Sequence, residues 1–305
     1  MQEKAYLFRV YTKAMSASEK DDFGVEKIFS DDTTSPKFVK FDIGEWGENS
    51  GDREHIAQLR YTSTKDGKPK SAKNSVVSTR WTKNGEEFID QEVTGYFYLP
   101  EIEPEEDKEE NIKFKKCGKG SSLTFKLRGG KHPKPSGDPN SAKSYNFDFQ
   151  YKGGDCNNFQ KEYPHPDYYK MRVDTKFELK DFIGKWVGYK AVTINQGDNV
   201  RCLAFVDYGS EDRKREDGPD LEKQNWKTYY DVTDDGELDK KYEIENPKGK
   251  NFSDEKGVPE PYRTHFKDKV TQFRMDRIVK PEAKFLSARR VSAVLIDDVV
   301  SKHLP

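Results

Sequence analysis

Two short stretches carry side chains suited to moving protons next to an acidic group. "KLRGGKH" places Arg128 at the end of an expected strand and His132 just past a glycine pair. "QKEYPHPDYYK" places Tyr163 and His165 among prolines, which hold the backbone extended. A guanidinium neutralises a carboxylate, histidine titrates near neutral pH, and a tyrosine hydroxyl donates a proton. Two plainer interpretations stand beside this one: the glycines turn an exposed corner, and the aromatic loop packs on a sheet edge.

Three other segments alternate polar and apolar side chains: "VTGYFYL" (93–99), "LTFKLR" (123–128) and "YNFDFQYK" (145–152). If their apolar faces share one core, their polar faces form a single outer surface. The ligand-binding residues expected on that surface are Tyr96, Tyr98, Lys126, Asn146, Asp148 and Gln150. Amides and carboxylates bind hydroxyl groups and tyrosines stack on sugar rings, so the surface suits a hydroxyl-rich ligand. The alternative is an ordinary solvated sheet face.

The elements that must position these residues are short strands, because helical periodicity is almost absent. Strands are also expected at 4–11, 55–62, 75–82, 187–195, 200–207, 226–232, 269–276, 283–290 and 292–297. The pattern predicts an all-β fold, an antiparallel β-sandwich or jelly roll with long polar loops. We expect one domain over residues 21–291, an N-terminal extension or extra strand at 1–20, and a C-terminal strand or tail at 292–305.

One hairpin is expected at the centre of a sheet. Residues 185–207 form two largely apolar segments around the turn sequence "NQGDN". Lys190 and Asn195 are the polar exceptions in the first segment. We expect the Lys190 ammonium to reach the surface along its aliphatic stem, rather than to pair inside the protein.

Composition narrows the protein class. The chain has 305 residues, of which 32% are hydrophobic, 36% charged and 13% aromatic, and its net charge is -1. The aromatic content indicates a globular protein with a thin core. No basic block supports nucleic-acid binding, and no segment reaches the roughly 18 apolar residues of a membrane span. The first residues lack an apolar signal region, so we expect a cytoplasmic protein, or an exported one whose signal was removed.

Loops and metal ligands give weaker signals. Charged runs at 101–111, 209–225 and 245–263 are expected to be solvated surface loops. The acidic turn "DVTDDGELD" (231–239) is a candidate for structural calcium, although its spacing differs from an EF-hand loop. The five histidines are scattered and the three cysteines lack CxxC spacing, so no zinc and no other cofactor is expected. Three cysteines permit at most one disulfide within the chain.

Several motifs resemble the concanavalin A-like lectin/glucanase jelly-roll superfamily. "YKAVTINQ" (189–196) is similar to the "YFKAGxYxQ" strand of alginate-lyase-like polysaccharide lyases, and "KLRGGKH" (126–132) lies where these proteins have an arginine-bearing strand. "TQFRMDRIVKPEAKFLSARRV" (271–291) resembles the last core strand pair of a lectin/glucanase-like domain, and "DDFGVEKIFSDD" (21–32) resembles openings of this class. The resemblance implies a concanavalin-like jelly roll and a polysaccharide partner.

For an enzyme, the resemblance implies a polysaccharide lyase that cleaves by β-elimination. This mechanism neutralises the sugar carboxylate, removes the neighbouring proton and protonates the leaving oxygen. Arg128, with Lys126 or Lys190 behind it, is the candidate for neutralising the carboxylate. His132 or His165 is the candidate base.

The remaining lyase roles have candidates as well. Tyr163 or Tyr189 would be the acid, and Asn195 or Gln150 would hold the carboxylate. The chain departs from the lyase pattern, because Ile194 stands where the lyase strand has a tyrosine and no "QIH" segment precedes it. Three interpretations therefore stay open: a lyase acting on an anionic polysaccharide, a non-catalytic lectin-like module, and a structural or surface interaction protein.

Overall fold

The structure of the protein is a computed structural model. It describes residues 20, 24–29, 41–43, 57–60, 75–79, 89–98, 122–129, 143–150, 159–162, 168–171, 173–179, 183–242, 244–245, 265–267, 270–276, 282–291 and 302–304. Within them, no helix has the length and apolar character needed to cross a membrane.

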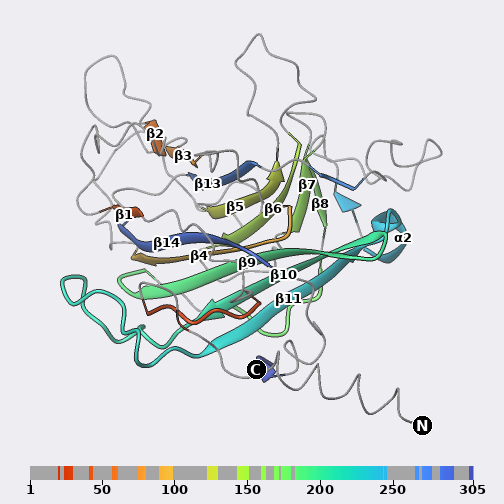
Figure 1. Ribbon diagram of the computed structural model, residues 1–305. Helices are drawn as coiled ribbons and strands as arrows, with labels where there is room; N and C mark the ends of the chain where they lie inside the picture. The colour runs from red at the N-terminus through yellow and green to blue at the C-terminus, as the bar shows by residue number, and fades with distance from the viewer. Residues whose placement is uncertain are drawn as a thin grey trace, which may run out of the picture.

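Two antiparallel sheets make up this part of the chain (Figure 1). The six-stranded sheet has the order β1 (Phe41–Ile43), β14 (Glu282–Arg290), β4 (Gln91–Tyr98), β9 (Trp186–Gln196), β10 (Asn199–Asp207) and β11 (Trp226–Asp234). The eight-stranded sheet has the order β12 (Ile244–Glu245), β8 (Tyr168–Met171), β7 (Phe159–Glu162), β6 (Ser144–Gln150), β5 (Ser122–Gly129), β13 (Val270–Asp276), β3 (Ser75–Thr79) and β2 (Ala57–Arg60). One short helix, α2 (Leu238–Lys241), follows β11. The expectation of an all-β, antiparallel protein is confirmed.

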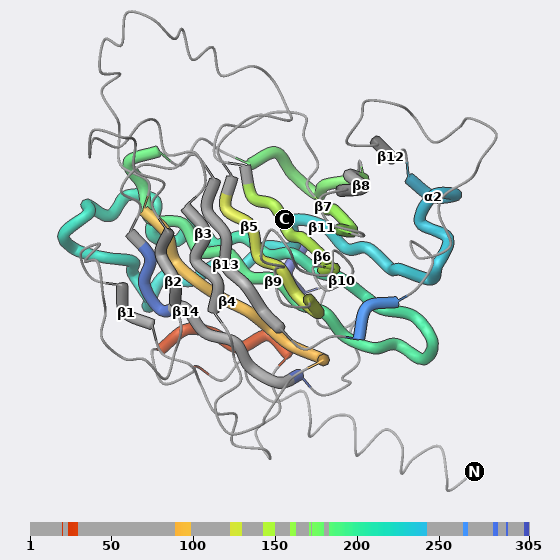
Figure 2. Tube along the Cα trace, turned by 90° about the horizontal axis from the view of Figure 1, so that it is seen from above, coloured from red at the N-terminus to blue at the C-terminus, as the bar shows by residue number. Residues whose placement is uncertain are grey.

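The sheets share an aromatic core between their inner faces, and the two layers are seen from the side in Figure 1 and from above in Figure 2. Ring contacts cross from one sheet to the other. The centroids of Phe97 and Phe125 lie 5.9 Å apart, and those of Phe149 and Tyr189 lie 4.4 Å apart. Each such pair adds about 0.5–1.5 kcal/mol beyond the apolar area it buries. Ten of the 25 buried residues of this cluster are aromatic, so rings supply a large part of the core.

A second apolar cluster covers the outer face of the six-stranded sheet. Residues 24–29 run across this face, on the side of the sheet away from β5 and β6 (Figure 1). Val25 and Phe29 are buried there among residues of β9, β10 and β11, and the Phe29 and Phe205 rings lie 5.9 Å apart. We call residues 24–29 the N-terminal strap. Strap and sheet together bury an aromatic face that would otherwise meet water.

The expected grouping of three alternating segments on one outer surface is wrong. β4 lies in the six-stranded sheet, whereas β5 and β6 are neighbours in the eight-stranded sheet. The outer face of β4 therefore points away from those of β5 and β6. Period-two alternation identifies the two faces of a strand but carries no information on which strand lies beside it.

Two loop expectations also change. Residues 160–170, read as one rigid loop, contain the end of β7 and most of β8, which pair antiparallel around residues 163–167 outside the described part. The run 209–225 exposes many charged side chains as expected, but its backbone folds over the sheet. Trp186 Nε1 donates hydrogen bonds to the Lys214 and Arg215 carbonyls at 3.2 and 3.3 Å. Of the other expected strands, 4–11 and 292–297 lie outside the described residues.

The close packing of the outer aromatic face predicts a sensitive glycine. A Cβ atom at Gly188 in β9 would lie 2.8 Å from both the Trp226 and Tyr96 rings. We expect Gly188→Ala to lower the free energy of unfolding by about 1–3 kcal/mol, because buried rings must shift. Gly197→Asn is the control: this turn residue has φ +62 and nothing within 4 Å, and asparagine tolerates that conformation. Urea unfolding measures both, and equal stabilities would contradict the packing described.

Candidate functional site

The outer face of the eight-stranded sheet carries a row of polar side chains from three neighbouring strands. Their positions alternate with core residues such as Phe125, Phe147 and Phe159, so they point away from the core. We call these residues the polar row: Thr124 and Lys126 of β5, Ser144, Asn146 and Asp148 of β6, and Gln160 and Glu162 of β7. Backbone pairing places Asn146 between Lys126 and Gln160.

Glu162 is the most heavily bonded member of the row. Its Oε2 forms an ion pair with Lys126 Nζ and accepts a hydrogen bond from Asn146 Nδ2 at 3.4 Å. Ser144 Oγ donates to Asn146 Oδ1 at 2.6 Å. Charge-assisted bonds of this kind are stronger than neutral ones. They hold the carboxylate and the amide in one orientation across three strands.

Asp148 forms the other half of the polar row. Its Oδ1 accepts a hydrogen bond from Thr124 Oγ1, and its Oδ2 accepts one from Gln160 Nε2. Gln160 thus bonds to Asp148. It lies two positions before Glu162 on β7, which is about 6.6 Å along an extended strand. The side chains form a continuous set of hydroxyl, amide and carboxylate groups.

The charge of the polar row is negative. It holds two carboxylates, on Asp148 and Glu162, against one ammonium, on Lys126. Gln160 is half-buried and the other six members are buried. In the backbone register, Gln272 of β13 pairs with Lys126. The third β6 candidate, Gln150, ends its strand opposite Ser122.

Arg128 leaves this face, although alternation places it with Thr124 and Lys126. Its backbone has φ +51, and the pairing of β5 with β13 shifts register at this point. This irregularity turns the side chain into the space between the sheets, where it is completely buried. The expected delivery of Arg128 to a cleft on the outer face is therefore wrong.

Between the sheets, Arg128 bonds to the six-stranded sheet. Its Nη2 lies 2.7 Å from Asp90 Oδ1, just before β4, and its Nη1 lies 3.0 Å from Asn195 Oδ1, near the end of β9. Asp90 Oδ1 also accepts the Asn195 backbone N–H at 2.8 Å. Nη1 has a longer contact of 3.4 Å to the Phe266 carbonyl. We call these four residues the arginine clamp.

Lys190 is also buried, contrary to the expectation that its ammonium reaches the surface. It lies on the outer face of the six-stranded sheet and donates to Glu92 Oε1 at 3.0 Å, Thr94 Oγ1 at 2.8 Å and the Glu26 carbonyl at 2.9 Å. Glu92 Oε2 accepts the Phe29 backbone N–H at 2.8 Å. The lysine and its carboxylate thus fasten the N-terminal strap through backbone groups.

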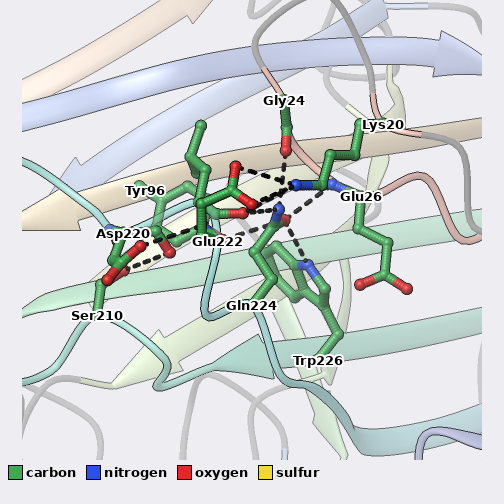
Figure 3. A network of polar contacts seen from close by, with 10 residues as sticks. Lys20, Gly24, Glu26, Tyr96, Ser210, Asp220, Glu222, Gln224 and Trp226 are labelled. Carbon is green, nitrogen blue, oxygen red and sulfur yellow. Dashed lines mark hydrogen bonds and ion pairs between the residues drawn. The ribbon is translucent and has the colours of Figure 1, made fainter.

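Figure 3 shows how the amide of Gln224 completes this attachment. Its Oε1 accepts hydrogen bonds from the Glu26 backbone N–H at 2.8 Å and Trp226 Nε1 at 3.2 Å. Its Nε2 donates to the Gly24 carbonyl at 2.8 Å. The Glu26 carboxylate points away from the network (Figure 3). The strap is therefore recognised mainly through its backbone.

Tyr96 belongs to the same buried network and not to the polar row. Its hydroxyl donates to Asp207 Oδ2 at 2.5 Å. Asp207 Oδ1 accepts the backbone N–H groups of Gly209 and Asn225 at 2.7 and 2.9 Å, which ties both ends of the charged loop together. Burial raises the pKa of the Asp207 carboxyl, although the Tyr96 hydroxyl and these N–H groups oppose the shift.

The expected site residues therefore fall into separate environments. The structure brings together Lys126, Asn146 and Asp148 in the polar row, and it brings Arg128 and Asn195 together in the arginine clamp. Tyr98 is half-buried on the other sheet, 5.5 Å from the Trp186 ring.

The other expected catalytic residues do not gather at one surface. Tyr189 lies in the core, where burial raises its pKa well above the ordinary value. Arg128 and Lys190 lie at the two different places described above. Candidates outside the described residues are His132, Tyr163 and His165.

Four members of the polar row were missed in the sequence: Thr124, Ser144, Gln160 and Glu162. Alternation in "LTFKLR" places Thr124 on the outer face, but its hydroxyl was not predicted to bind a ligand. β7 gave a weaker signal, because the buried Lys161 breaks the alternation of apolar residues in "FQKE". Because the charged Lys161 occupies a core position, the alternation of apolar residues does not reveal that Gln160 and Glu162 face outward.

No group of three or more His, Cys, Asp or Glu residues is placed to hold a metal ion within the described ranges. In the turn proposed for calcium, Asp234 pairs with Lys161 and Asp235 with Lys241. Cys202 is a free, buried thiol in the core.

Comparison with known proteins adds no name to this geometry. No protein-family model matches the chain, and no curated protein matches it. The functional argument therefore depends on the arrangement of the residues themselves.

The arginine clamp predicts a large loss of stability when it is broken. Arg128→Met removes the buried guanidinium and leaves Asp90 without its cation, and we expect about 2–4 kcal/mol less unfolding free energy. Lys240→Met is the control, because its ion pair with Glu237 is exposed on both sides and should cost about 1 kcal/mol or less. Urea unfolding of both variants tests this, and similar losses would argue against a special role for the clamp.

Asp207 predicts a measurable pH dependence. Because its folded-state pKa is raised, the folded protein binds this proton more tightly than the unfolded chain does. Its contribution to stability is therefore best at low pH and falls as pH rises from about 3.9 through the raised value. We expect Asp207→Asn to gain stability relative to the wild type across that window. Unfolding at stepped pH measures this difference, and Asp212→Asn, at an exposed position, controls for net charge. A constant difference between Asp207→Asn and wild type would refute the assignment.

Proposed function

We propose that the chain is a carbohydrate-binding protein with a concanavalin-like jelly-roll sandwich, and that the polar row binds a polysaccharide. The observation that supports this proposal is the polar row itself. Its hydroxyl, amide and carboxylate groups come from three adjacent strands and hold one another in fixed orientations. Preorganised donors and acceptors of this kind suit ligands that are covered with hydroxyl groups.

The charge of the row supports an uncharged polymer over an anionic one. Two carboxylates outnumber the single ammonium of Lys126, and Glu162 already pairs with that ammonium. A polymer rich in carboxylates or sulfates would meet repulsion from Asp148 and Glu162. A neutral, hydroxyl-rich glycan avoids this repulsion and would first contact the half-buried amide of Gln160, because Lys126 and Glu162 are buried.

Binding without cleavage agrees better with the described residues than a lyase does. β-Elimination needs a cation, a base and an acid around one sugar. Arg128 lies between the sheets, Tyr189 lies in the core and Lys190 lies under the N-terminal strap. These three cannot surround one substrate. A lyase would have to rely on His132, Tyr163 and His165 together with the polar row.

Retardation in gels that contain polysaccharide tests the proposal. We expect neutral glucans, mannans or xylans to retard the protein, and alginate or pectate to retard it less. Gln160→Ala should weaken binding at least several-fold, since its half-buried amide bonds to Asp148 and is the member of the row nearest to solvent. Arg201→Gln, on the outer face of the other sheet, should bind normally.

Parallel absorbance readings at about 235 nm detect the unsaturated product of β-elimination. A rise in absorbance with any polymer would show that the protein is a lyase and would contradict binding without cleavage. No retardation by any polymer would favour a structural or interaction protein.

A further inference from the structure

A second group of buried ionisable side chains lies between the two sheets, apart from the polar row. Lys161 of β7 points inward, and its Nζ lies 2.7 Å from Oδ2 of Asp234 at the end of β11. Both side chains are completely buried. β7 belongs to the eight-stranded sheet and β11 to the six-stranded sheet, so the pair joins the two layers across the core.

Hydrogen-bond donors hold both oxygens of the Asp234 carboxyl group. The Tyr145 hydroxyl donates to Oδ2 at 2.6 Å, and the Gly236 backbone N–H donates to Oδ1 at 3.1 Å. His265 Nε2 lies 3.8 Å from Oδ1. Donors placed in this way stabilise negative charge that develops on a carboxyl oxygen during addition of a nucleophile.

The surroundings of the Lys161 ammonium are aromatic. Its Nζ lies 5.0 Å from the centroid of the Phe266 ring and 5.7 Å from that of Tyr145. Burial lowers the pKa of Lys161, and the Asp234 carboxylate opposes that shift only in part. A low dielectric penalises the charged ammonium, so burial favours the neutral, nucleophilic amine of Lys161.

We propose that Lys161 and Asp234 are joined by an intramolecular amide bond that forms after the chain folds. The neutral amine of Lys161 attacks Cγ of Asp234, and the Nζ–Cγ bond forms. The Tyr145 hydroxyl stabilises the tetrahedral oxyanion on Oδ2, and the Gly236 N–H holds Oδ1, the oxygen that leaves. The amine loses a proton, one carboxyl oxygen leaves as water with a proton relayed by His265, and no oxidant or cofactor is needed. One amine and one carboxylic acid become one amide and one water.

Two other buried lysine–carboxylate pairs show why this one is singled out. Lys190 donates to Glu92, Thr94 and the Glu26 carbonyl, a set of acceptors that keeps an ammonium charged. Lys126 and Glu162 face outward within the polar row. Lys190 also lies near a ring, 4.3 Å from the Trp226 centroid, and Glu92 also has donors on both oxygens. Asp234 differs in that one of its donors is a tyrosine hydroxyl, Tyr145, and that His265 Nε2 lies beside its other oxygen.

The intact mass of the denatured full-length protein tests the proposal. We expect the wild type to weigh about 18 Da less than its sequence requires, because one water is lost. Lys161→Arg should restore the full sequence mass, since a guanidinium stays charged and does not attack. Lys190→Arg is the matched control and should keep the deficit.

Peptide mapping locates the bond. After trypsin digestion, we expect a branched peptide that joins the β7 segment to the β11 segment. A wild-type protein with the full sequence mass would overturn the proposal. So would a deficit that persists in Lys161→Arg, because the water would then have been lost elsewhere.

Discussion

The contact between Arg128 and Asp90 is the constraint on which the relation of the two sheets depends. A guanidinium cannot be discharged, so a buried one requires acceptors placed to match its fork. Those acceptors come from the loop before β4 and from the end of β9, whereas the arginine comes from β5. The two layers must therefore meet in one register at this end of the core. To reach these acceptors, the backbone of Arg128 adopts a positive φ, which is a strained conformation for a residue other than glycine.

The same irregularity divides the chemistry of the eight-stranded sheet. Because Arg128 turns inward, Lys126 is the cation of the polar row. The two carboxylates of the row outnumber it. β7 shows the division within four residues. Gln160 and Glu162 face outward among amides and hydroxyls, and Lys161 faces inward among aromatic rings. One strand thus supplies both a polar surface and a buried amine.

Much of the fold was predictable from the sequence, and less of the site. Alternation in segments such as "LTFKLR" and "YNFDFQYK" identified strands and their apolar faces correctly, because a half-buried strand must alternate. Sheet membership was not predictable, since strand partners are set by long-range packing. Residues that break alternation by being buried and charged were misjudged for the same reason. Lys190 forms its ion pair with Glu92, and Arg128 forms its ion pair with Asp90, only after strands that are distant in the sequence come together.

The N-terminal strap has a consequence for the order of events during synthesis. Its partner Gln224 lies 198 residues beyond Glu26 in the chain, and Glu92 lies 63 residues beyond Phe29. At a ribosomal rate of about 5–20 residues per second, the strap emerges at least several seconds before its binding face exists. Its apolar side chains, Val25 and Phe29, must wait exposed during that time. Residues 24–29 are therefore made well before the strands that bury them, and they reach their place only after β11 has been made.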